Sequence, residues 1–125
     1  RPGLRDFHQR RETREGTFVT AEEIDAVHGT DWANLFRAKV PFAVVDPIGL
    51  TITSTRGPNG FSGPCKAVIY IDGMRHPTAS LTDVFLPLIG GIEYYSPGFV
   101  PVQYREMTPS SAGSAGCGVL LVWHR

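Results

Sequence analysis

The sequence predicts a small α/β domain of the α+β kind, in which a mixed β-sheet carries short helices. Capping signals followed by helically spaced apolar residues occupy residues 20–41. The length of 125 residues suits one domain with a single core. Runs that are apolar or rich in β-branched residues follow at 50–55, 66–71, 91–95 and 117–124.

Residues 1–17 are expected to form a polar lead or linker ahead of the folded domain, which we place at 18–125. Leu4 and Phe7 fall at helical spacing, so a short surface helix ending near Gly16 fits the pattern. A solvated segment is the main expectation for this arginine-rich stretch. Contact with nucleic acid or lipid is the alternative, which the interspersed acidic residues disfavour.

Two helices are predicted within residues 20–41. The first begins with a capping box, in which the Thr20 hydroxyl accepts from a helical amide while Glu23 reaches back, and it ends at Gly29. A cap at residue 30 or 31 begins the second helix. The apolar face of that second helix consists of Trp32, Leu35 and Phe36.

The periodicity changes after the second helix. A short apolar run at 42–45 is followed by a β-rich alternation at 50–55. Residues 66–71 are the most strand-like in the chain, and their mostly apolar character is typical of a strand covered on both faces. Asp72 and Gly73 follow directly and predict a hairpin turn.

The second half of the domain is predicted to alternate between helices and strands. Residues 80–86 open with a Ser-x-x-Asp capping box and predict a short helix that Pro87 disturbs. A strand at 91–95 leads into a Ser-Pro-Gly turn. One or two helical turns are expected at 102–107, and 117–124 is the last strand.

The charge balance disfavours two classes of function. Lys and Arg number 12 and Asp and Glu number 12, so the chain carries no net charge. A neutral chain is a poor match for a phosphate-binding nucleic-acid protein or a polybasic membrane-surface protein, and we expect no nucleic-acid partner. No apolar stretch approaches the roughly 18 residues of a transmembrane helix.

Two cysteines stand immediately before two predicted strands. If those strands are parallel neighbours, Cys65 and Cys117 come within disulfide reach, which would indicate an oxidising compartment. The alternatives are two free buried thiols, or a catalytic or metal role that would need distant histidines.

No enzyme, cofactor or metal site emerges from the remaining residues. Asp83 and Glu93 are single carboxylates without a partner nearby in sequence, and Asp72 is assigned to its turn. The tyrosines and Trp123 could line a ligand-stacking face, although packing is the commoner role of aromatic strand residues. Isolated, exposed or capping roles are expected for His8, His28, His76 and His124.

Four ordered motifs resemble the plug domain of TonB-dependent outer-membrane receptors. They are Arg56-Gly57 after a strand, Ile69-Tyr-Ile-Asp-Gly73, Gly91-Ile-Glu-Tyr-Tyr-Ser-Pro-Gly98 and Gly116-Cys-Gly-Val-Leu-Leu-Val-Trp123. The resemblance covers about residues 18–125. It assigns motif positions to Arg56, Gly57, Asp72, Gly73, Glu93, Gly98 and Gly118.

The resemblance implies a plug-like fold in the outer membrane or periplasm of a Gram-negative cell envelope. It implies a non-catalytic gating or substrate-contact role in the uptake of a metal chelate, cobalamin or glycan. In complete receptors such a domain sits inside a barrel and moves when a TonB-type partner pulls its N-terminus. Arg56 and Glu93 would pair with the barrel wall, and without a barrel they would face solvent.

The chain departs from the family in ways that leave a second function open. It has no room for a barrel, its Ser-Pro-Gly inverts the family's Gly-Pro order, and its cysteine pair is not general in the family. It is also similar to barrel-less plug-like units linked to a carboxypeptidase-regulatory-like domain. The alternative is therefore a free-standing periplasmic or cell-surface binding module, whose ligand-facing loops would contain Asn59, Phe61, Phe99 and Tyr104.

Overall fold

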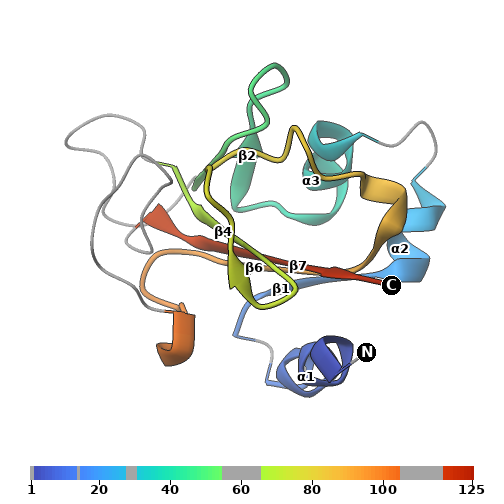
Figure 1. The fold of residues 1–125 in the computed structure, drawn as a ribbon, viewed down its shortest axis with the longest axis vertical. Coiled ribbons are helices and arrows are strands. Elements are labelled where there is room, and N and C mark those ends of the chain that lie inside the picture. The colour runs from blue at the N-terminus through green and yellow to red at the C-terminus, as the bar shows by residue number, and fades with distance from the viewer. Residues whose placement is uncertain (1, 14, 28–30, 55–65, 105–116) are drawn as a thin grey trace.

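A computed structural model describes residues 2–13, 15–27, 31–54, 66–104 and 117–125. Helix α1 lies on one side of a five-stranded sheet, and α3 and the small β2–β3 sheet lie on the other (Figure 1). No helix within these ranges has the length and apolar character needed to cross a membrane. The elements are α1 (Pro2–Arg11), β1 (Thr17–Thr20), α2 (Ala21–Ala26), α3 (Trp32–Lys39), β2 (Ala43–Val45), β3 (Ile52–Ser54), β4 (Val68–Ile71), β5 (Met74–Arg75), η1 (Leu86–Leu88), β6 (Ile89–Tyr95), η2 (Val102–Tyr104) and β7 (Val119–His124).

The large sheet is mixed, as the sequence predicts. Its strand order is β1-β6-β7-β4-β5, and β4 and β7 run parallel with Val68 opposite Val119. The other pairs in this sheet are antiparallel. The expectation that the two strands following the cysteines are parallel neighbours is therefore confirmed.

Alternate residues of the central strands feed two separate cores. Ile69, Ile92 and Leu120 point into the larger core, which α2, α3 and the β2–β3 sheet complete. Val119 and Leu121 belong to the smaller core, which includes Phe7 of α1. Every residue of β6 is buried because both of its faces are covered.

The caps of α2 and α3 are those that the sequence predicts. The Thr20 hydroxyl accepts a hydrogen bond from the Glu23 amide at 3.3 Å, and the Glu23 carboxylate accepts from the Thr20 amide at 3.0 Å. Asp31 caps α3 by accepting from the Asn34 amide at 2.7 Å. Each cap satisfies an amide that has no partner within its own helix.

The predicted turns at Asp72-Gly73 and Ser96-Pro97-Gly98 are also confirmed. Asp72 and Gly73 join β4 to β5 with φ values of 52° and 89°, as a two-residue hairpin turn requires. Gly98 has a φ of 91°, and the Phe99 amide donates to the Ser96 carbonyl at 3.0 Å. Proline followed by left-handed glycine is the preferred sequence for such a turn.

The expected solvated lead is wrong for residues 2–11. A helix does form there, but its Phe7 is 0% exposed and packs into the smaller core. The sequence interpretation also missed β1, whose four residues pair with β6. Phe18 and Val19 between two threonines are a β-rich signal too short to separate from the lead.

The helix predicted at 80–86 is wrong as well. Ser80 forms an isolated bridge with Thr51, and its hydroxyl donates to the Gly49 carbonyl at 2.6 Å. These contacts hold the backbone extended where a helical cap would have to form. Pro87 then limits the helical segment to the short η1, since proline has no amide to donate.

We predict that Gly118→Ala destabilises the domain more than Gly98→Ala. Both glycines have positive φ, but a Cβ on Gly118 would lie 2.8 Å from the Tyr94 Oη and 3.1 Å from the Tyr95 carbonyl oxygen. A Cβ on Gly98 meets nothing within 4 Å. Urea denaturation should show a loss of about 1 kcal/mol for Gly98→Ala and roughly 3 kcal/mol for Gly118→Ala. Equal losses would contradict the steric part of this explanation.

Candidate functional site

The most unusual group in the described structure is the carboxylate of Glu93, on the middle of β6. Its side chain is 0% exposed and points to the face of the sheet that α1 covers. An ionised carboxylate at such a position requires both a countercharge and hydrogen-bond donors. Three residues supply them, and together with Glu93 they form what we call the Glu93 cluster: Arg10, Tyr95 and Trp123.

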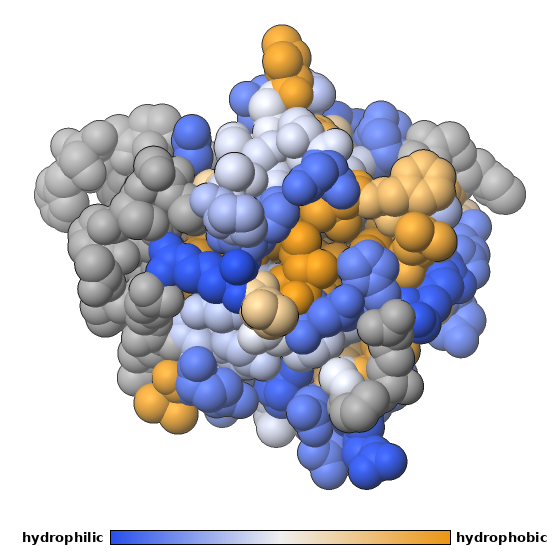
Figure 2. Space-filling model, in the orientation of Figure 1, coloured by the Kyte–Doolittle hydropathy of each residue, from blue (hydrophilic) through white to orange (hydrophobic). Residues whose placement is uncertain are grey.

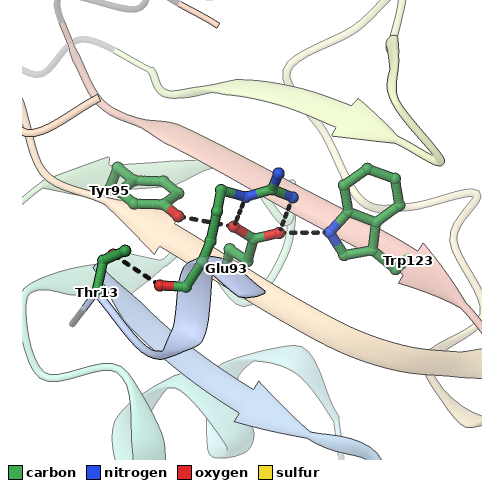
Figure 3. A network of polar contacts seen from close by, with 5 residues as sticks. Thr13, Glu93, Tyr95 and Trp123 are labelled. Atoms are coloured by element: carbon green, nitrogen blue, oxygen red, sulfur yellow. Dashed lines mark hydrogen bonds and ion pairs between the residues drawn. The ribbon is translucent and has the colours of Figure 1, made fainter. Parts of the chain in front are cut away.

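Each oxygen of Glu93 accepts two hydrogen bonds (Figure 3). Oε1 accepts from Arg10 Nε at 2.8 Å and from Tyr95 Oη at 2.7 Å. Oε2 accepts from Arg10 Nη2 at 2.8 Å and from Trp123 Nε1 at 2.6 Å. The bidentate pairing uses the planar guanidinium fork, and it leaves the carboxylate fully satisfied.

The sheet itself positions two of the donors. Tyr95 is two residues beyond Glu93 on β6, so the two side chains lie on the same face. Trp123 is paired with Gly91 on the neighbouring β7, which makes it the diagonal neighbour of Glu93. Strand periodicity and the β6–β7 register therefore bring both donors to one carboxylate.

Arg10 is the donor that comes from outside the sheet. Its guanidinium carbon lies 5.8 Å from the ring centroid of Tyr104 and 5.7 Å from that of Trp123. The Thr13 hydroxyl donates to the Arg10 carbonyl at 2.7 Å, which fixes the end of α1 (Figure 3). The hydrogen bonds to Glu93 raise the pKa of Arg10 above its ordinary value, so the cation is permanent.

Burial, with a further contribution from the charge of Glu93, raises the pKa of Tyr95 well above its ordinary value. Tyr95 therefore remains a neutral donor to Glu93. Burial likewise raises the pKa of Tyr104. A shielded carboxylate with all four acceptor positions used is suited to holding Arg10, and with it α1, in place rather than to proton transfer.

The expectation that Glu93 faces solvent in the absence of a barrel is therefore wrong. Its partner Arg10 is 83 residues away in sequence, so no local pattern indicated the pair. The signal that was available is a Glu in a strand where every neighbour is apolar or aromatic, because such a residue requires a cation from another element. The lead contains several arginines, but helical spacing alone does not say which one is used.

The other motif residues have structural roles. The Asp72 carboxylate accepts from the His124 amide at 2.9 Å and is 2.7 Å from His124 Nδ1, which ties the hairpin turn to the end of β7. His76 Nε2 lies 2.9 Å from Asp83 Oδ1, so neither His76 nor His124 is isolated as the sequence suggested. In the ranges that the structure covers, no three His, Cys, Asp or Glu side chains gather as metal ligands.

The residues expected to face a ligand are divided between described and undescribed parts of the chain. Phe99 is 52% exposed beyond the turn at Gly98. Tyr104 is half-buried, with its ring 5.0 Å from that of Tyr70. Outside the described residues lie Arg56, Gly57, Asn59, Phe61 and Cys65. Cys117, the cysteine that the structure describes, is not a free thiol.

Comparison of the chain with protein-family models, with curated proteins and with solved structures finds no match.

We predict that breaking the buried ion pair on one side costs more than removing it altogether. Arg10→Gln leaves the buried Glu93 without a cation and should lower the free energy of unfolding by about 3–5 kcal/mol. The double variant Arg10→Gln/Glu93→Gln should lower the free energy of unfolding by less than Arg10→Gln alone, because no uncompensated charge remains. Thermal or urea denaturation of both variants measures the difference.

The control for this pair is the exposed one between Asp25 and Arg125, whose Oδ1 and Nη2 are 2.5 Å apart. Asp25→Asn should change the free energy of unfolding by less than about 1 kcal/mol. A double variant of the Glu93 cluster that loses more stability than Arg10→Gln would contradict an ionised Glu93.

We predict that stability falls as the pH rises above about 10, where tyrosines of the unfolded chain lose their protons. Folded Tyr95 keeps its proton because burial raises its pKa, so the folded state binds more protons than the unfolded state. The free energy of unfolding then decreases by up to about 1.4 kcal/mol per pH unit for this one group.

Urea denaturation between pH 9 and 11 measures this slope, and Tyr95→Phe should make it shallower. Absorbance at 295 nm should show that fewer than the chain's 4 tyrosines ionise before the circular dichroism of the fold is lost. Ionisation of all of them in the folded protein would contradict the prediction.

Proposed function

We propose that this chain is a non-catalytic plug-like domain of the TonB-dependent receptor type, with a gating or substrate-contact role in nutrient uptake. The observation that carries the proposal is the position of the ordered motifs in the fold. Three of them supply β4, β6 and β7, which are adjacent in one mixed sheet. The Asp-Gly and Pro-Gly steps of these motifs form the turns that follow β4 and β6.

Exposed apolar side chains lend further support. Figure 2 shows separate apolar patches on the visible face, one of them at the tip of the segment between β2 and β3. Ile48 in that segment is 88% exposed. A domain enclosed by a larger protein would cover such side chains. The described residues include these exposed large apolar side chains: Phe42, Val44, Ile48, Met74, Phe85, Leu88, Phe99 and Val102.

A disulfide between Cys65 and Cys117 is part of the proposal, and with it an outer-membrane or periplasmic location. The parallel pairing of β4 with β7 supports it, because each cysteine precedes one of these strands. Closing a loop of about 53 residues would stabilise the fold by on the order of 4 kcal/mol in the chain-entropy model.

Thiol titration of the denatured, unreduced protein is expected to find no free thiol, and titration after reduction should find both cysteines. Reduction should lower the denaturation midpoint of the native chain, while a Cys65→Ala/Cys117→Ala variant should not respond to reductant. Two free thiols in protein isolated from the cell envelope would contradict the proposed pairing.

The proposed function is tested in the Gram-negative bacterium that carries the natural gene. We expect the protein in the outer-membrane or periplasmic fraction, and we expect its deletion to lower uptake of a metal chelate, cobalamin or a glycan. Complementation with the natural gene should restore uptake. Localisation in the cytosol together with unchanged uptake of all three ligand classes would overturn the proposal.

A binding module without a barrel is the second candidate, favoured by the exposure of Phe99 and Val102 beyond β6. Titration calorimetry of the chain against the same three ligand classes separates the two functions. Saturable binding that Phe99→Ser abolishes would favour the module. Absence of binding together with an uptake defect would favour the plug.

A further inference from the structure

Helix α1 is seated on the sheet by residues spaced at i, i+4 and i+7. Gly3, Phe7 and Arg10 form this stripe, and each meets a particular feature of β6 or β7. The other side chains of the helix from Arg5 onward are exposed. Leu4, between Gly3 and Phe7, is partly buried against the smaller core and adds an apolar contact. The helix is therefore held by a narrow stripe rather than by a broad apolar face.

The first contact requires a small residue on the helix. A Cβ placed on Gly3 would lie 2.5 Å from Trp123 Cε3, so the helix approaches the indole ring as closely as a glycine allows. The second contact requires a small residue on the sheet. A Cβ placed on Gly91 would lie 3.1 Å from Phe7 Cε2, so the absent side chain makes room for the phenyl ring.

The third contact requires an arginine. Glu93 is fully buried and accepts two bonds from Arg10, while Tyr104 and Trp123 lie beside the guanidinium. A lysine would lack the bidentate fork, and a neutral residue would leave a buried carboxylate without a cation. Removing α1 without replacing it would leave Glu93 as an uncompensated charge, which costs free energy. A second helix that carries an arginine could take the place of α1 without that cost.

Helix α1 in turn depends on its contacts with the sheet to remain helical. A stretch of 10 residues is too short to be a stable helix alone in water, and α1 has no acidic residue in its first turn. Its order comes from docking, in the manner of a peptide that folds on binding.

We propose that the sheet face formed by Gly91, Glu93 and Trp123 is a binding site for a basic helical peptide segment with glycine, phenylalanine and arginine at i, i+4 and i+7. Helix α1 is its intramolecular occupant and can be exchanged for a segment of the same pattern from another polypeptide. This site does not depend on the proposed role in uptake.

Exchange is governed by effective concentration. Residues 12–16 join α1 to β1, and so short a connection holds the helix at an effective concentration of about a millimolar or more. A free peptide competes poorly with the intact occupant. Weakening the occupant without altering the sheet should open the site to the peptide.

The test uses the full chain carrying Arg10→Gln and a synthetic peptide of residues 1–13 with its natural sequence. We expect saturable binding at least ten times tighter to this variant than to the natural chain. A peptide with Phe7→Ala and Arg10→Gln should bind at least ten times more weakly. Arg11→Gln is the matched control chain, because Arg11 is exposed on the same helix and should leave binding as in the natural chain.

The two indole N–H signals of the chain report where the peptide binds. Trp123 donates to Glu93, so its signal should shift in the Arg10→Gln variant and return toward its natural position when the peptide is added. Trp32 donates to the Val84 carbonyl in the other core, so its signal should stay unchanged.

If Arg10→Gln fails to fold, Gly3→Ala is the second variant that weakens the docking of α1. It disturbs the contact with Trp123 and retains the ion pair. It too should bind the natural peptide more tightly than the natural chain does. Binding that is equal for the folded variant and the natural chain, or equal for the natural and substituted peptides, would overturn the proposal.

Discussion

The need to neutralise one buried carboxylate organises half of this domain. Glu93 lies on a strand that is covered on both faces, where the free-energy cost of an unpaired charge exceeds the gain from most single contacts. A cation must come from outside the sheet, and Arg10 supplies it. The same carboxylate orders Tyr95 and Trp123 by accepting a hydrogen bond from each, so that β6, β7 and α1 share one set of polar contacts. Helix α1 is thereby made part of the fold although its sequence is mostly polar.

The elements on the two faces of the sheet are consequently held in place by different kinds of interaction. On the face of α2 and α3 the core is built from apolar and aromatic residues without a charged group, and the helices begin at strong local caps. Each contact there is a small part of the total packing, so the loss of one leaves most of the core in place. On the face of α1 a small apolar cluster surrounds a charged centre. Its stability depends on a few directional contacts that are made or lost together, which is the character of a recognition site rather than of a general core.

The sequence predicts features whose cause lies within a few residues. The Thr20–Glu23 capping box, the Asp72-Gly73 turn and the apolar runs of β4 and β7 are all of this kind, and the structure contains each of them. The parallel pairing of β4 and β7 is present as well, but the sequence supports it only as the condition under which the two cysteines could meet. The Arg10–Glu93 pair could not, since several arginines in the lead satisfy the same local pattern. Residues 80–86 illustrate the opposite error, in which the contacts of Ser80 with Thr51 and Gly49 override a local helix signal.

These properties give the proposed plug function a mechanical consequence. Under that function a pull on the N-terminal segment would reach α1 before the sheet. The contacts of Gly3 and Phe7 with the sheet and the bidentate pair between Arg10 and Glu93 would together resist it. Because the carboxylate also accepts from Tyr95 and Trp123, removal of Arg10 would leave those two donors beside an uncompensated charge. Release of α1 would expose the carboxylate and the smaller core together, which converts a local displacement into an open binding face. Under the proposed exchange, recapture of α1 or capture of a similar helix would neutralise the carboxylate again, so the residues that stabilise the domain would also define the two states of this face.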